Sequence, residues 1–107
     1  MSTFNDRENA FENKYAHDAE MQFKAEARRN KLLGLWAAEL MGKADDAAAD
    51  YAKEVIKADF EEAGDEDVIR KLLGDLVTAE IDIDEAQIRA ALEEKQIEAR
   101  RALMGEA

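Results

Sequence analysis

The side chains best suited to bind another protein lie near the amino terminus, where three aromatic residues recur at helical spacing. Phe4, Phe11 and Tyr15 are seven and four residues apart, which would align them along one side of a helix. Arg7 and Lys14 stand beside them and could pair with carboxylates of a partner. This pattern favours helix-in-groove recognition, in which a helix places its apolar face in a groove of another protein.

Polar residues in the same segment could cap the start of that helix. Thr3 with Asp6, or Asn5 with Glu8, has the spacing of a capping box. His17, the single histidine, has no nucleophile nearby and no ExxH pattern. We therefore expect His17 to face solvent or a partner rather than to act in catalysis.

The remaining candidates for chemistry are weak. Asp46, Asp50 and Glu54 share one helical face and could in principle bind a hard cation, but a solvated acidic face is the expected reading. The chain has no cysteine, and its five glycines are isolated, so thiolate metal sites, cysteine nucleophiles and phosphate-binding glycine loops are excluded. We predict that the protein is not an enzyme and uses no cofactor.

Composition and charge limit the class of partner. The 107 residues carry a net charge of −11, which argues against nucleic acid as the main partner. With 38% charged residues and a mean hydropathy of −0.55, neither membrane insertion nor a secretory signal is expected. The sequence therefore predicts a small acidic protein of the cytoplasm.

Charge and aliphatic content divide the chain into two parts. All 18 Leu, Ile and Val residues lie at or after Leu32, and the preceding 31 residues are neutral, so the rest carries the whole negative charge. Burying three aromatic rings contributes at most about 2 to 3 kcal/mol each. Ordering some fifteen residues costs roughly 1 to 2 kcal/mol apiece. We therefore predict a mobile arm over residues 1–19 and a bundle over residues 20–107, joined by a continuous or frayed helix.

Abundant alanine, few β-branched residues and no proline predict an all-α fold, a four-helix bundle with a mobile N-terminal arm. The first strong helix should end before Gly42, and its charged stretch from Gln22 to Lys31 should project or lie on the surface. Its apolar stripe comprises Leu32, Leu33, Trp36 and Leu40.

Three further helices follow from caps and periodicity. Asp45 is expected to cap the second helix, Asp65 to Asp67 to begin the third, and Asp84 with Gln87 to form a capping box at the fourth. The apolar faces expected for the second and third helices comprise Ala48, Tyr51, Ala52, Val55, Ile56 and Phe60, and then Val68, Ile69, Leu72, Leu73, Leu76 and Val77. In the fourth, Ile88, Leu92, Ala99 and Leu103 should face the core, whereas Ile97 and Met104 form a second patch that touches another helix or stays exposed.

Several stretches carry a family resemblance. Phe4-Asn5-Asp6-Arg7-Glu8 and the long run from Phe23-Lys24-Ala25-Glu26 to Trp36-Ala37-Ala38-Glu39 resemble the ATPase-inhibitor ζ-subunit family of α-proteobacterial F-type ATP synthases. The resemblance continues through Tyr51-Ala52-Lys53-Glu54-Val55 and Ala58-Asp59-Phe60-Glu61-Glu62. Ala19 departs from the family pattern, which has a second acid at this position.

The resemblance implies a four-helix bundle whose amino-terminal segment wedges into the α/β/γ interface of the catalytic sector. On this sequence the inhibitory segment matches Met1 to about Lys14, with Tyr15 and His17 just beyond it. It also implies a cytoplasmic protein held peripherally at the inner membrane through the ATP synthase, and weak nucleotide binding for which no motif is present. The contact candidates are Phe4, Asp6, Arg7, Glu8, Phe11, Lys14, Tyr15 and His17.

Two other functions remain open on the sequence. The chain could be a small helical module that senses nucleotide or binds protein, although its anionic surface disfavours nucleotide. A carboxylate metalloenzyme is less favoured, because the usual histidine ligands are absent. We expect the free protein to be monomeric.

Overall fold

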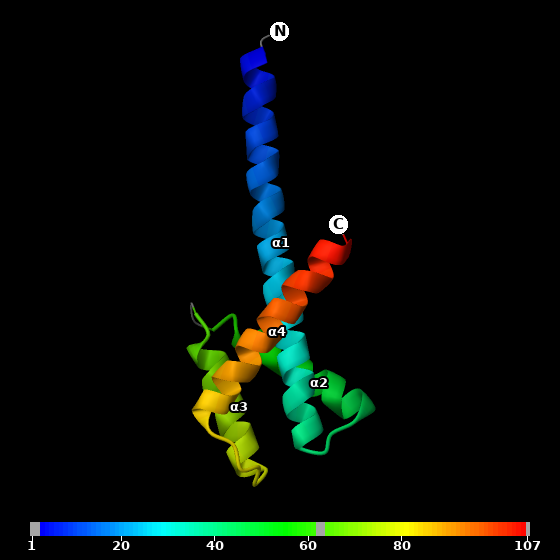
Figure 1. The fold of residues 1–107 in the computed structure, drawn as a ribbon, viewed down its shortest axis with the longest axis vertical. Coiled ribbons are helices and arrows are strands. Elements are labelled where there is room, and N and C mark those ends of the chain that lie inside the picture. The colour runs from blue at the N-terminus through cyan, green and yellow to red at the C-terminus, as the bar shows by residue number, and fades with distance from the viewer. Residues whose placement is uncertain (1–2, 62–63, 107) are drawn as a thin grey trace.

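In a computed structural model of the protein, the backbone is described for residues 3–61 and 64–106, and side chains for residues 19–61 and 64–105. The described residues form four helices and no strand, which confirms the all-α prediction (Figure 1). The helices are α1 (Thr3–Leu40), α2 (Asp45–Ala58), α3 (Glu66–Thr78) and α4 (Glu85–Glu106).

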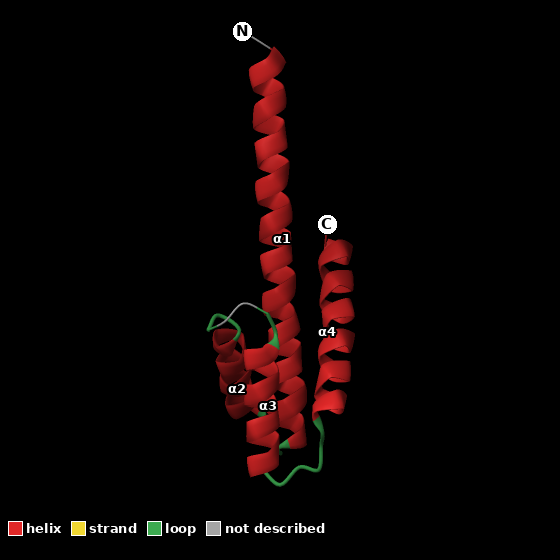
Figure 2. Ribbon diagram, turned by 90° about the vertical axis from the view of Figure 1, so that its left-hand side faces the viewer, coloured by secondary structure: helices red, strands yellow, loops and turns green. Residues whose placement is uncertain are grey.

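Helix α1 is much longer than the others and extends beyond them at its amino-terminal end (Figures 1 and 2). Its lower half packs against α2 and α4, and α4 runs antiparallel to it. The backbone continues through residues 19 and 20 without a break, as predicted for a continuous helix. The mobility of residues 1–19 stays a prediction, because the side chains of residues 1–18 lie outside those described.

The turn after α1 follows the predicted cap, but the start of α2 does not. Gly42 has a positive φ of 77°, and the Lys43 N–H donates to the Ala38 carbonyl at 2.8 Å, as in a Schellman motif. Asp45 is not the N-cap: the helix begins at Asp45 itself, and extended Ala44 occupies the cap position without a side-chain bond. Ala44 takes the cap position because its carbonyl accepts the first hydrogen bonds of the helix, from the Ala47 and Ala48 N–H groups.

The starts of α3 and α4 agree with the sequence prediction. Helix α3 begins directly after Asp65, with acidic residues in its first turn. At α4, the Asp84 N–H donates to Gln87 Oε1 at 2.9 Å and the Gln87 N–H donates to Asp84 Oδ1 at 2.8 Å. This reciprocal pair is the predicted capping box.

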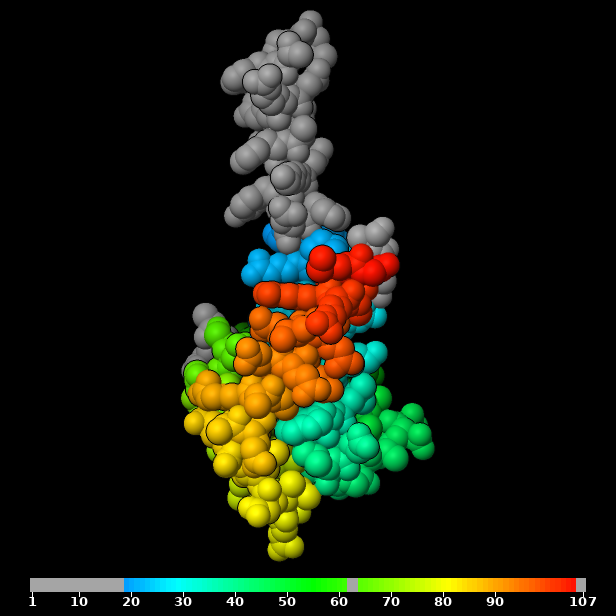
Figure 3. All heavy atoms as spheres, viewed as in Figure 1, coloured from blue at the N-terminus to red at the C-terminus, as the bar shows by residue number. Residues whose placement is uncertain are grey.

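The core lies where the lower half of α1 meets the other three helices, and α4 runs across one face of it (Figure 3). Its largest fully buried apolar side chains are Leu33, Val55, Val68, Leu72, Leu76 and Ile88. Trp36 is partly buried against this cluster, as expected for a core residue. Leu103 is half-buried, and Ile97 and Met104 are exposed, so the second patch on α4 is open to solvent.

Three residues predicted to face the core are exposed. Phe60 is 65% exposed because α2 ends at Ala58, two residues before it, and the helical phase no longer applies. Leu40 and Val77 lie in the last turns of α1 and α3, where the neighbouring helices cover less of the surface.

The prediction for residues 22–31 is wrong in part. Arg29 and Asn30 are buried, because the end of α2 and the α2–α3 connection pack against this part of α1 and supply polar partners for both side chains. The packed region of α1 therefore begins before the first aliphatic residue, Leu32.

Helices α1 and α2 approach each other closely at Gly34. A Cβ at this position would lie 2.7 Å from the Ala52 Cα, a backbone atom that no side-chain rotation can move. A Cβ added at Gly74 in α3 would have no such neighbour within 4 Å. The glycine at residue 34 therefore sets the spacing of the two helices.

We predict that Gly34→Ala lowers the free energy of unfolding by about 1 to 3 kcal/mol, because the methyl group must push α2 away from α1. Gly74→Ala is the matched control and should raise it by up to about 1 kcal/mol, since alanine favours an exposed helix interior over glycine. Urea denaturation followed by circular dichroism measures both. Equal effects of the two substitutions would contradict a steric role for Gly34.

Candidate functional site

The side chains predicted to contact a partner lie outside those described. The backbone of all eight residues belongs to α1, so they share one helix with the core-packing residues further along. The predicted contact set therefore remains a prediction, and its members are Phe4, Asp6, Arg7, Glu8, Phe11, Lys14, Tyr15 and His17.

A buried polar cluster lies where α1 leaves the bundle. The Arg29 side chain is only 5% exposed, and its Nε and Nη2 donate to Asn30 Oδ1 at 3.0 and 2.8 Å. Its Nη1 lies 3.0 Å from Asp65 Oδ1, and its Nη2 lies 3.6 Å from Asp59 Oδ1. The guanidinium thus joins α1 to the C-cap of α2 and to the α2–α3 connection.

Asn30 completes this cluster from the same helix. Its Nδ2 donates to Asp59 Oδ2 at 2.9 Å, while its Oδ1 accepts from Arg29. The other oxygen of this aspartate, Oδ1, is buried and has no hydrogen-bond partner among the described residues. The cluster therefore leaves one acceptor unsatisfied beside the ion pair.

Carboxylates outnumber the positive charge here. Oxygens of Glu26, Asp59 and Asp65 all lie within 4.8 Å of one another, with Arg29 Nη2 3.8 Å from Glu26 Oε1. Burial, and then the neighbouring Asp59, raises the pKa of Glu26 above its ordinary value of 4.5, although Arg29 opposes this shift. Three carboxylates are suitable ligands for a hard cation, but the Arg29 guanidinium already lies within 3.0 to 3.8 Å of each of them.

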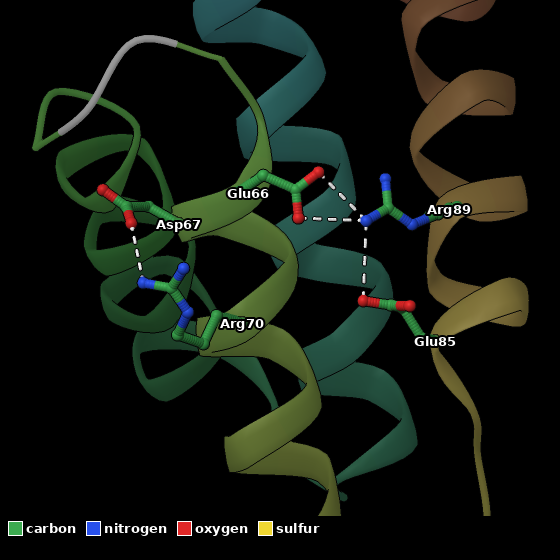
Figure 4. A network of polar contacts seen from close by, with 5 residues as sticks. All are labelled: Glu66, Asp67, Arg70, Glu85 and Arg89. Atoms are coloured by element: carbon green, nitrogen blue, oxygen red, sulfur yellow. Dashed lines mark hydrogen bonds and ion pairs between the residues drawn. The ribbon is translucent and has the colours of Figure 1, made fainter.

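Two other polar networks have a structural role. Arg89 of α4 contacts both oxygens of Glu66 at 3.0 Å and Glu85 at 3.5 Å, while Arg70 lies 3.2 Å from Asp67 within α3 (Figure 4). The Arg89 contacts are exposed, and pairs of this kind contribute at most about 1 kcal/mol. They orient α3 against α4 rather than form a binding site.

The second network lies between α2 and α3. The Tyr51 hydroxyl donates to Asp75 Oδ2 at 2.8 Å, and Lys71 Nζ lies 3.0 Å from the same oxygen and 5.2 Å from the Tyr51 ring centroid. Burial, and then Asp75, raises the pKa of Tyr51 far above its ordinary value of 10, so the hydroxyl remains a donor.

Asp46, Asp50 and Glu54 are exposed on α2, which confirms the solvated acidic face.

Sequence reasoning missed Arg29 and Asn30 as buried residues. The signal was the phase of the apolar stripe: Arg29 lies four residues before Leu33, and Asn30 lies four before Gly34. Extending the buried face one turn toward the amino terminus would have placed both residues inward. Their partners Asp59 and Asp65 follow the end of α2 and could not be paired with them from spacing alone.

The described part of the chain is an all-helical fold, and comparison with known proteins gives its family. A family model described as ATPase inhibitor subunit zeta matches residues 1–102, and the chain belongs to this family. One similar solved structure, determined by solution NMR, is 59% identical in sequence with a TM-score of 0.72. That match covers 81% of this chain and 99% of the other. No curated protein matches the chain.

The membership confirms the resemblance read from the sequence. Among the described residues, no helix combines the length and apolar character needed to cross a bilayer.

We predict that Asn30→Ala lowers the free energy of unfolding by about 2 to 3 kcal/mol, because it leaves the buried Arg29 and Asp59 without their shared partner. Lys31→Ala removes an exposed neighbouring side chain and should change it by no more than about 0.5 kcal/mol. Chemical denaturation measures both variants. A cost for Asn30→Ala as small as that of the control would show that the cluster does not stabilise the fold.

Proposed function

We propose that this protein blocks ATP hydrolysis by an F-type ATP synthase by inserting its amino-terminal arm into the α/β/γ interface of the catalytic sector. The observation that supports this most directly is the course of α1, which carries the family's amino-terminal segment beyond the other three helices (Figures 1 and 2). The bundle is then too bulky to follow and remains outside the cleft as an anchor.

The arm acts through binding rather than chemistry. Phe4 and Phe11 fill apolar pockets of the catalytic sector, and Arg7 and Lys14 pair with its carboxylates. Either Asp6 with Thr3 or Glu8 with Asn5 forms the capping box at the start of the arm helix. Tyr15 and His17 contact the mouth of the cleft. A helix held between stator and rotor subunits obstructs rotation in the hydrolytic direction.

The energetics of the arm favour a partner-dependent helix. Residues 1–31 contain no Leu, Ile or Val, so the arm has little apolar surface to bury against its own bundle. An isolated helix of about fifteen residues is marginal in water, and contacts with the cleft supply the missing stabilisation. In the cell the protein works in the cytoplasm, bound at the membrane through the synthase.

We predict that deletion of residues 1–14 abolishes inhibition of ATP hydrolysis, because every proposed contact inside the cleft is removed. The midpoint of thermal unfolding should stay nearly unchanged, since the core begins at Arg29. ATPase assays with increasing amounts of full-length and truncated protein test this directly. Undiminished inhibition by the truncated protein would reject the proposed mechanism.

We also predict that Phe11→Ala raises the concentration needed for half-inhibition by roughly tenfold or more, because a buried aromatic anchor typically contributes over about 1.4 kcal/mol to binding. Glu12→Ala, at the adjacent position, is the control and should raise it by less than about threefold. The same ATPase titration measures both. If the glutamate substitution has the larger effect, the assignment of the aromatic face is wrong.

A further inference from the structure

Two aromatic rings are exposed beside the buried polar cluster. Phe23 of α1 is 55% exposed, and Phe60, just after the end of α2, is 65% exposed. Their ring centroids are 6.0 Å apart, with the ring planes tilted by 35°. Aromatic side chains left in solvent, already in contact and held on two separate elements, are typical of a protein interface.

The rings border a shallow hollow with a charged wall. Small apolar groups line it, and carboxylates of Glu26 and Asp59 line it as well. Arg29 does not line this hollow, but its Nη2 lies 3.6 Å from Asp59 Oδ1 and 3.8 Å from Glu26 Oε1, so a single positive charge offsets part of the negative charge of the wall. The complete lining is Phe23, Glu26, Ala27, Asn30, Ile56, Asp59 and Phe60.

The wall carries more negative charge than Arg29 balances. The Asp59 side chain is only 9% exposed, and its Oδ1 has no hydrogen-bond partner among the described residues. Together Glu26, Asp59 and Asp65 exceed the single charge of Arg29 by two negative charges at full ionisation. A positively charged donor at the hollow would relieve this repulsion by pairing with the Glu26 carboxylate, whose side chain is 45% exposed.

We propose that the aromatic–carboxylate notch formed by Phe23, Phe60, Glu26 and Asp59 is a docking site for an arginine side chain of a partner protein. Arginine fits both features, because its planar guanidinium stacks on aromatic faces and donates in parallel to carboxylate oxygens. An apolar side chain would cover the half-exposed Glu26 carboxylate without donating a hydrogen bond to it. A second copy of the chain is disfavoured by its net charge of −11.

The position of the notch indicates which partner carries the arginine. Phe23 lies nine residues after Lys14 on the same helix, a rise of about 13 Å. A protein that holds the arm would therefore extend to the notch. The identity of this partner as the ATPase rests on the proposed function, whereas the preference of the notch for arginine does not.

The preference can be tested on the full chain with two short peptides, acetyl-Gly-Arg-Gly-amide and the matched acetyl-Gly-Leu-Gly-amide. In NMR titrations the arginine peptide should cause saturable shifts of the Phe23 and Phe60 ring protons and of the Asn30 side-chain amide. Added salt should weaken the binding. Phe60→Ala should reduce the affinity at least fivefold, whereas Val77→Ala, an exposed apolar residue on α3, should leave it unchanged.

Three outcomes overturn the notch as an arginine site. Equal shifts with the leucine peptide would make it an apolar docking surface. Shifts of the same rings on increasing protein concentration alone would make it a contact between copies. Absence of saturable shifts in a chain whose amide spectrum shows a folded bundle would show that arginine does not bind there.

The identity of the partner has its own test. Phe60→Ala should raise the concentration for half-inhibition of the ATPase about threefold with the arm intact, and Val77→Ala should not. Unchanged inhibition by Phe60→Ala, together with lost peptide binding, would overturn the ATPase as the arginine donor. Persistent inhibition after deletion of residues 1–14 would instead reject the arm mechanism and leave the peptide result standing.

Discussion

The fold depends on a guanidinium that is shielded from water. Removing the charge of Arg29 from solvent is costly unless partners surround it, and those partners come from three different places in the chain. Asn30 precedes the aliphatic part of α1, Asp59 caps α2, and Asp65 lies before α3. The long helix, the end of α2 and the α2–α3 connection therefore favour one joint arrangement, because packing that buries Arg29 without Asp59 and Asp65 would leave its charge without partners.

The features that could be predicted from the sequence are those decided by neighbouring residues. A left-handed turn at Gly42 and the reciprocal pair of Asp84 and Gln87 each involve only a few consecutive positions, so the local pattern was sufficient. The periodic stripe of Val68, Leu72 and Leu76 was equally clear, because one face of α3 is buried along most of its length.

The features that escaped prediction depend on which elements meet. Phe60 continued the apolar phase of α2, but the helix ends before it and the ring turns to Phe23 instead. Asn30 and Arg29 read as surface residues because polar side chains usually are, and only the arrival of Asp59 makes their burial possible. The candidate site contains aromatic residues and buried polar residues. Each of them can be read from the sequence, but their arrangement depends on contacts between distant elements and cannot.

The uninterrupted course of α1 has a mechanical consequence. A helix of 38 residues is a rod about 57 Å long, and each residue turns the chain by about 100° about the axis. In the proposed bound state, in which the cleft holds the arm as a helix, the azimuth of the amino-terminal aromatic positions is therefore fixed by how Leu33 and Gly34 pack in the core. One residue inserted into α1 between the amino-terminal segment and the core would turn that segment by about 100° about the helix axis. Seven inserted residues would nearly restore its orientation and would only lengthen the helix. The packing of α1 in the core thus determines the direction, about the helix axis, in which a distant recognition surface faces in that bound state.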